Sequence, residues 1–329
     1  MLQGPASQPQ IDIATPIARE LNAVLDVFDR ELASDLPFVN RLTQQVRNYR
    51  GKLLRPKLLL LAGRASGELT HDHVVLAAVV EMVHMATLVH DDVLDEADMR
   101  RRHDTVNRLV GNEGAVMLGD FLISHAYHLC SSLSSTFASR RIAAVTNTVC
   151  EGELLQIENR GNILLSEETY FDIIRRKTAA LTAVCCEMGA VASGADDETI
   201  AALTRYGADL GVAFQIVDDL LDLTATEHET GKSVGRDAEM GKPTLPVIRF
   251  LAGASAADRE AMIAALTHPT PDTPATLRSM LRGSDAIEQA FDAAASYVTS
   301  ATAAIAPLPD SDAKASLIAA AEFVLARRQ

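Results

Sequence analysis

Apolar positions recur every three or four residues along most of the chain, the spacing that puts apolar side chains on one face of an α-helix. One clear stripe runs through Ile17, Leu21, Val24, Phe28 and Leu32. Alternating apolar and polar positions, which are typical of strands, are nearly absent, so we expect an all-α protein. The further stretches with helical spacing lie at residues 58–61, 74–93, 113–134, 138–159, 167–192, 198–224, 244–252, 256–266, 275–282, 285–304 and 311–327.

The chain shows no sign of a boundary between domains. Residues 1–14 are polar and carry Pro and Gly, so we expect a disordered lead-in. No linker and no repeat of 20–50 residues follows. The sequence therefore predicts one all-α domain over residues 15–329. The breaks between its helical stretches carry the expected residues, at Gly67, Gly111, Gly161, Gly194 and Pro269–Pro274.

Composition supports the helical interpretation and limits the partners. Apolar residues make up 48% of the chain and aromatic residues only 4%, with no Trp, which favours helix over sheet. Lys plus Arg is 30 and Asp plus Glu is 44, giving a net charge of −14. Nucleic-acid binding needs clustered positive charge, so we expect no nucleic-acid partner. An anionic substrate remains possible, because a few basic residues in one pocket suffice.

Cysteine usage and hydropathy indicate a soluble cytoplasmic protein. The cysteines, which lack disulfide or zinc spacing, are expected to be small core residues. The N-terminal residues lack the apolar centre of a signal peptide. The most apolar window, 74–90, contains Glu81 and His84, so no run of about 18 apolar residues is expected to span a membrane. The four cysteines are Cys130, Cys150, Cys185 and Cys186.

One acidic pattern occurs twice, each time at the end of a predicted helix. Within each copy, positions i and i+4 lie one turn apart on the same face. Like charges so placed repel, and negative charge at a helix C-terminus opposes the helix dipole. Mg²⁺ prefers carboxylate and phosphate oxygens, so two facing copies predict a magnesium–diphosphate site. The copies are Asp91, Asp92 and Asp95, and Asp218, Asp219 and Asp222.

The alternative interpretation of an acidic run is a solvated or capping helix end. We interpret residues 196–198 that way, because they precede a helix, where negative charge is stabilising. The two copies above differ because basic and polar residues accompany each, and Arg and Lys are the usual partners of diphosphates. These companions are Lys52, Arg55, His84, Arg100, Arg101, Arg102, Lys177, Thr178, Gln215, Lys232 and Lys242. A P-loop-like segment at 230–233 is set aside, since Thr226 replaces its first Gly and no strand precedes it.

With these motifs, residues 45–250 resemble the trans-isoprenyl diphosphate synthases, the polyprenyl synthetase family. The resemblance rests on GKLLRP (51–56), HMATLVHDDVLDEADMRR (84–101), GELLQ (152–156), Lys177-Thr178, FQIVDDLLD (214–222) and GKSVGRD…GKPTLP (231–246). It implies an all-α helical bundle around a deep central cavity, usually as a homodimer. The sequence departs from the family pattern at Arg50, Leu53 and residues 102–104.

The resemblance also implies a role for each matching residue. Isopentenyl diphosphate would be held by Lys52, Arg55, His84 and Arg101. The allylic diphosphate would be held by Arg100, Lys177, Thr178, Gln215, Lys232 and Lys242. Three Mg²⁺ ions per active site would be bound mainly by Asp91, Asp95 and Asp218, with Asp92, Asp219 and Asp222 nearby. The residues implied to act in catalysis are Asp91, Asp92, Asp95, Lys177, Asp218 and Asp219.

Product length is expected to depend on the helix before Asp91. Family members with short products commonly carry a bulky aromatic residue about there, whereas Ala86 and Thr87 are small. Each helical turn rises about 5.4 Å, so an open path favours a long product of about seven to ten isoprene units. A floor near Phe121, Ile123 and Tyr127 is the open alternative. A long product is expected to need membrane or detergent for release.

Three other functions remain as alternatives. The first is a short-chain farnesyl or geranylgeranyl diphosphate synthase. The second is a subunit of a heteromeric synthase that is inactive alone, although a regulatory subunit usually loses an Asp-rich motif. The third is a terpene cyclase, which would lack the isopentenyl diphosphate site.

Overall fold

The computed structural model describes residues 13–101, 103–224, 240–268, 270 and 272–327, and the all-α prediction is confirmed. The two-residue strands β1 (Met99–Arg100) and β2 (His103–Asp104) pair as an antiparallel hairpin and are the only strands in these ranges. Most of the expected lead-in, Lys232, Arg102 and the P-loop-like segment lie outside the described residues. The helices are α1 (Ala18–Glu31), α2 (Pro37–Tyr49), α3 (Leu54–Ser66), α4 (His71–Leu94), α5 (Val106–Ser131), α6 (Thr136–Glu158), α7 (Glu167–Ile174), α8 (Ala180–Ala192), α9 (Asp197–Thr224), α12 (Leu245–Gly253), α13 (Ala256–Thr267), α14 (Thr273–Arg282), α15 (Ala286–Ala304) and α16 (Asp312–Ala326).

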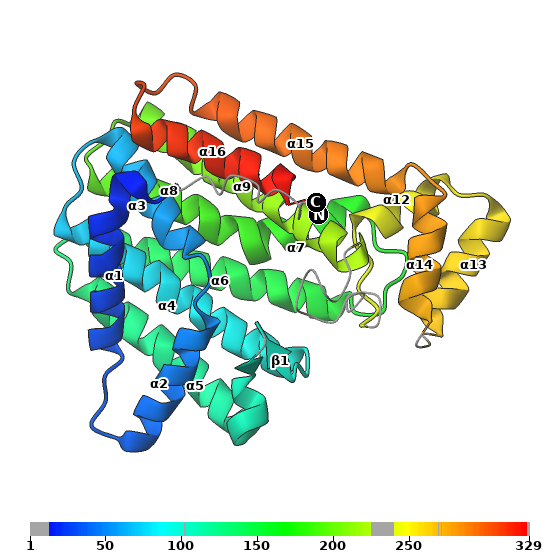
Figure 1. The fold of residues 1–329 in the computed structure, drawn as a ribbon, viewed down its shortest axis with the longest axis horizontal. Helices are drawn as coiled ribbons and strands as arrows, with labels where there is room; N and C mark the ends of the chain where they lie inside the picture. The colour runs from blue at the N-terminus through cyan, green and yellow to red at the C-terminus, as the bar shows by residue number, and fades with distance from the viewer. Residues whose placement is uncertain (1–12, 102, 225–239, 269, 271, 328–329) are drawn as a thin grey trace, which may run out of the picture.

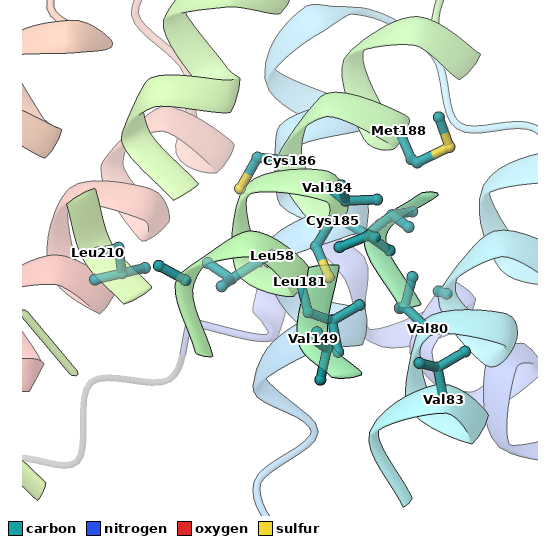
Figure 2. Packing of buried hydrophobic residues seen from close by; sticks show 14 of the residues in the cluster. Leu58, Val80, Val83, Val149, Leu181, Val184, Cys185, Cys186, Met188 and Leu210 are labelled. Carbon is teal, nitrogen blue, oxygen red and sulfur yellow. The ribbon is translucent and has the colours of Figure 1, made fainter. Parts of the chain in front are cut away.

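The core forms where α3, α4, α8 and α9 pack together, with α5 along α4 and α15 along α9 (Figure 1). Figure 2 shows how Leu58 of α3, Val80 of α4 and Leu210 of α9 lie around Leu181 and Cys185 of α8. Each fully buried side chain of this kind stabilises the fold by about 1.5–3 kcal/mol. Cys130, Cys185 and Cys186 are core residues as predicted, whereas Cys150 is exposed.

Helix α4 is apolar enough to be mistaken for a membrane span. By length and composition it is the one helix in the described ranges that could cross a membrane, which the sequence analysis did not expect. However, 78% of its most apolar 18-residue window is buried inside the protein. Its apolar surface is therefore covered by neighbouring helices, as in a core helix.

A second, smaller apolar cluster lies among α12, α13 and α14, with Leu223 from the end of α9. In Figure 1, α13 and α14 lie at one end of the molecule and α1 and α2 at the other. Ile287 at the start of α15 packs against both clusters. The second cluster is thus joined to the main core by α9 and α15.

Several helix boundaries differ from the predicted ones for identifiable reasons. Helix α3 begins at Leu54, before the predicted stretch at 58–61, so Arg55 lies in its first turn. Gly111, expected as a break, is a kink inside α5 with φ 79°. The stretch 167–192 is continuous but passes through a π-helical turn at Arg175–Ala179. The capping interpretation of residues 196–198 is confirmed, because Asp196 Oδ1 accepts a 2.8 Å hydrogen bond from Thr199 N, which lowers the pKa of Asp196.

Candidate active site

Both acidic motifs lie on the wall of one cavity of about 2110 Å³. The C-terminal ends of α4 and α9 bring the two motifs there from opposite parts of the chain. The start of α3, the β-hairpin and the π-helical turn complete the wall. The described site residues that line it are Lys52, Arg55, His84, Thr87, Asp91, Asp92, Asp95, Arg100, Arg101, Lys177, Thr178, Gln215, Asp218, Asp219, Asp222 and Lys242.

The backbone around this cavity is strained in three places. Leu53 (φ 52°), Glu96 (φ 49°) and Arg101 (φ 50°) adopt the left-handed conformation, and all three line the cavity. They are the only non-glycine residues with positive φ in the described ranges. Such strain concentrates at functional sites, where the surrounding structure maintains it.

In the first motif, Asp92 holds Arg100. The Asp92 side chain is 2% exposed, and Arg100 Nε lies 2.9 and 3.1 Å from its two carboxylate oxygens. Arg100 Nη2 adds a third contact at 2.8 Å. The pair assigns Asp92 to orienting Arg100, so this carboxylate is a poorer candidate metal ligand than its neighbours.

The other two carboxylates of the first motif face lysines. Lys242 Nζ lies 2.8 Å from Asp95 Oδ1, and Lys177 Nζ lies 3.9 Å from Asp91 Oδ2. Lys177 also forms an ion pair with Glu153. Burial raises the pKa of Asp91 to about 6, with Lys177 opposing the rise and Glu153 adding to it. Lys177 and Lys242, two of the three lysines predicted for the allylic diphosphate, are thus beside the predicted metal ligands.

Three side chains contact the carboxylates of the second motif. Arg327, at the end of α16, places Nη2 3.0 Å from Asp218 Oδ1 and its guanidinium 4.7 Å from the centre of the Phe214 ring. Tyr170 Oη donates a 2.6 Å hydrogen bond to Asp219 Oδ2. Gln215 Nε2 donates to Asp219 Oδ1 at 2.8 Å. Asp222 lies one turn further along α9.

The residues predicted for isopentenyl diphosphate share one part of the wall. Arg55 is half-buried, and its Nε is a buried atom that has no hydrogen-bond partner among the described residues. Burial, with Arg55, Arg100 and Arg101 nearby, lowers the pKa of His84 well below its usual value, so the imidazole is neutral. Lys52 Nζ lies 4.9 Å from the centre of the Phe323 ring. An unpaired buried donor among cations is the chemistry that an anion satisfies.

Two glycines allow this close assembly. A Cβ on Gly51 would collide with the guanidinium of Arg101, and a Cβ on Gly152 would lie 2.6 Å from the backbone N of Lys177. Gly51 and Gly152 are the first residues of the motifs GKLLRP and GELLQ. These motifs therefore keep one position free of a side chain so that a cationic residue can approach.

The chain-length residues are only partly placed as predicted. Thr87 lines the cavity, with Leu88 beside it, whereas Ala86 is fully buried in the core and is not part of the wall. Phe121, Ile123 and Tyr127 pack against the main core and do not line the cavity either. Ala86 therefore does not lie on the wall of this cavity, and a path of the growing chain along Ala86 stays a prediction.

Sequence reasoning missed Tyr170, Glu153 and Arg327. Glu153 lies within GELLQ, and Tyr170 lies two helical turns before Lys177. Their closeness in sequence to predicted site residues is a weak indication that both belong to the site. Arg327 is far from every motif in the sequence, and no local pattern indicates it.

The carboxylates fit a divalent cation that arrives with a diphosphate. Within the described residues, no three Asp, Glu, His or Cys side chains come close enough together to hold a metal ion on their own. Mg²⁺ is usually bound by one or two carboxylates and takes its other ligands from phosphate oxygens and water. The oxygen donors of Asp91, Asp95 and Asp218 meet that requirement on two walls of the cavity.

Comparisons with known proteins agree with this geometry. The polyprenyl synthetase family model matches residues 37–282. The chain is 33% identical to octaprenyl diphosphate synthase of Escherichia coli, covering 94% of this chain and 96% of that protein. It is 34% identical to heptaprenyl diphosphate synthase component 2 of Bacillus subtilis, covering 94% and 89%.

A solved structure is equally similar. It is a polyprenyl synthase from Caulobacter crescentus, complexed with calcium and isoprenyl diphosphate, which superposes with a TM-score of 0.92 at 33% identity. The match covers 96% of this chain and 97% of that one. The chain belongs to the polyprenyl synthetase family of prenyltransferases.

Proposed function

We propose that this chain is a magnesium-dependent enzyme that condenses isopentenyl diphosphate head to tail with an allylic diphosphate and forms a long all-trans polyprenyl diphosphate. One observation carries the proposal: two acidic motifs and two sets of cations line a single cavity. A site for one diphosphate would need only one such set. Two sets allow two diphosphates to be held side by side.

The allylic diphosphate fits beside the first motif. Lys177 and Lys242 lie there and would exchange their present carboxylate partners for phosphate oxygens, whereas Arg100 lies there in the orientation that Asp92 gives it. Three Mg²⁺ ions, held by Asp91, Asp95 and Asp218, would neutralise the diphosphate and so make it a better leaving group. Lys177 and Arg100 add fixed positive charge where the negative charge develops.

Isopentenyl diphosphate fits beside Arg55, Arg101 and Lys52. The C–O bond of the allylic partner breaks, and the departing diphosphate keeps the electron pair. The double bond of isopentenyl diphosphate then attacks the allylic carbon, and a proton passes from the new cation to the departed diphosphate. Holding both substrates in one cavity supplies much of the rate.

The long product is supported by the size and lining of the cavity. Its volume of about 2110 Å³ exceeds the roughly 300–1,000 Å³ of ordinary ligand pockets. Apolar side chains also line it, among them Val149, Ile173 and Leu210. No aromatic side chain occupies position 86 or 87.

We also propose that the chain works as a homodimer in the cytoplasm. Apolar side chains are exposed on α5 and α6, which contact each other: Met117 and Leu154 are each 65% exposed, and Val116 is 41% exposed. A partner's matching surface would cover them. The similarity to component 2 of the Bacillus subtilis synthase favours a second possibility, a catalytic subunit that needs a different partner chain.

One experiment tests both the reaction and the partner. The purified chain alone is incubated with Mg²⁺, labelled isopentenyl diphosphate and farnesyl diphosphate, and the dephosphorylated products are separated by chromatography. We expect a series of products whose longest member has about seven to ten isoprene units, as the small side chains at positions 86 and 87 predict. Products of only three or four units contradict the long-chain proposal, and no product without a second subunit contradicts independent catalysis.

A further inference from the structure

The middle carboxylate of each acidic motif is buried and held from a neighbouring element. Asp92 is 1% exposed and Asp219 is 6% exposed. Arg100, from the β-hairpin, holds Asp92, and Tyr170, from α7, holds Asp219. The motifs thus share an arrangement in which an outside donor fixes the middle residue, although the donors differ in charge.

Burial and ring packing hold Tyr170 in this contact. It is 4% exposed, and its ring packs edge-on against Phe171 with 5.5 Å between ring centroids. Its hydroxyl donates to Asp219 Oδ2 at 2.6 Å while Gln215 Nε2 donates to Oδ1 at 2.8 Å. Because each carboxylate oxygen has a donor, the carboxylate cannot rotate without losing a hydrogen bond.

The same helix links the second motif to Lys177. Helix α7 continues directly into the π-helical turn that carries Lys177 and Thr178. Thr178 Oγ1 donates a 2.8 Å hydrogen bond to Gln215 Oε1, and Gln215 contacts Asp219. Two hydrogen-bonded bridges, one from Tyr170 and one from Thr178, therefore connect the segment of Lys177 with α9.

We propose that Tyr170 is a positioning residue for the second acidic motif. It fixes Asp219, and through it the last turns of α9, so that Asp218 and Asp222 face the cavity in register with Lys177. Tyrosine and glutamine orient Asp219 as uncharged donors, whereas the Arg100 that holds Asp92 is a cation. This inference rests on the proposed function.

The test compares two conservative variants. Tyr170→Phe removes the hydroxyl from Asp219. The matched control is Tyr206→Phe, because Tyr206 is also buried and donates one hydrogen bond, at 2.7 Å, to the carbonyl of Leu317, away from the cavity. Binding of inorganic diphosphate is measured by calorimetry across a range of Mg²⁺ concentrations, and Michaelis constants are measured for both substrates.

We expect Tyr170→Phe to raise the Mg²⁺ concentration for half-maximal diphosphate binding by about tenfold, the lower end of the effect of losing a partner of a metal ligand. The Michaelis constant for the allylic substrate should rise, and that for isopentenyl diphosphate should stay unchanged. Tyr206→Phe should lower only the melting temperature. A Tyr170→Phe protein with wild-type Mg²⁺ dependence, or one that loses its helical signal, overturns the proposal and makes Tyr170 a structural residue.

A double variant tests whether Tyr170 acts through Asp219. If it does, adding Tyr170→Phe to Asp219→Asn should weaken Mg²⁺-dependent diphosphate binding little further. A full additional tenfold loss contradicts this route. Failure of the proposed function can be distinguished from failure of this inference, because in that case the wild-type protein itself would show no metal-dependent condensation.

Discussion

Arg327 Nη2 lies 3.0 Å from Asp218 Oδ1, so the last helix of the chain contacts the second acidic motif. The Asp218 side chain is 44% exposed, and such pairs contribute only about 0–1 kcal/mol. Arg327 nevertheless occupies the place that a cation would take. A metal ion that binds Asp218 through Oδ1 would displace this guanidinium.

The first prediction follows from that competition. Arg327→Gln should lower the Mg²⁺ concentration needed for half-maximal activity, by at most about fivefold, because the pair is worth no more than about 1 kcal/mol. Activity measured against Mg²⁺ concentration checks this. Arg205→Gln, on the exposed surface of α9, is the control. A higher Mg²⁺ requirement in the Arg327 variant would show that the guanidinium assists binding instead.

The second prediction concerns Gly51. A Cβ at this position displaces the Arg101 guanidinium, so Gly51→Ala should raise the Michaelis constant for isopentenyl diphosphate by about tenfold, typical of losing a charged hydrogen bond of 1.5 kcal/mol or so. The allylic constant should not change. Gly253→Ala is a matched control, since its Cβ would meet nothing within 4 Å. Equal effects on both substrates would show that the division of the basic residues is wrong.

The third prediction concerns Glu81, which is 3% exposed inside α4. Burial raises its pKa from 4.5 to about 7, although Arg55, Arg101 and Arg50 oppose the rise. A carboxyl whose pKa is higher in the folded than in the unfolded protein stabilises the folded state at pH values below the unfolded-state pKa. This stabilisation is lost as pH rises through the folded-state pKa. Between about pH 4.5 and 7 the folded protein therefore binds the extra proton.

Replacing Glu81 by Gln removes that titration. The stability of Glu81→Gln relative to wild type should increase from pH 4.5 to 7 and then level off, by an amount on the order of 3 kcal/mol. Denaturant unfolding at a series of pH values measures the difference. Glu68→Gln, whose side chain is 92% exposed, should show no such slope. A flat difference for Glu81→Gln would mean that the carboxyl is ionised throughout this range.

The fourth prediction concerns product length. Thr87 faces the cavity, so Thr87→Phe should shorten the product. Ala86 is buried in the core, so Ala86→Phe should overpack it and cost about 1–3 kcal/mol of stability. Chromatography of dephosphorylated products and thermal unfolding separate the two effects. Unchanged product length in the Thr87 variant would place the growing chain elsewhere.

The strongest helices and the motif positions could be predicted from the sequence because they depend on local pattern. The long apolar runs before Asp91 and Asp218 indicate buried helices that end in carboxylates. Helix α2 is absent from the prediction, although Leu42, Val46 and Tyr49 recur at helical spacing and are buried. The π-helical turn at Lys177 also leaves no mark on the apolar spacing.

What the sequence could not predict depends on packing between distant segments. Ala86 and Thr87 are neighbours of similar size, and only the rotation of α4 decides that Thr87 faces the cavity. The contact of Arg327 with Asp218 depends on where α16 ends in space. The role of Asp92 in holding Arg100 requires the β-hairpin to bring Arg100 back over α4.

The central claim is that both acidic motifs act together in metal-dependent prenyl transfer, and the rate of diphosphate release tests it most directly. Purified wild-type, Asp91→Ala and Asp218→Ala proteins are compared with Mg²⁺, isopentenyl diphosphate and an allylic primer, with and without chelator. We expect wild-type activity that chelator abolishes, and a loss of orders of magnitude in each variant with an unchanged helical signal. Undiminished release by either variant, or release that survives chelator, would contradict the account.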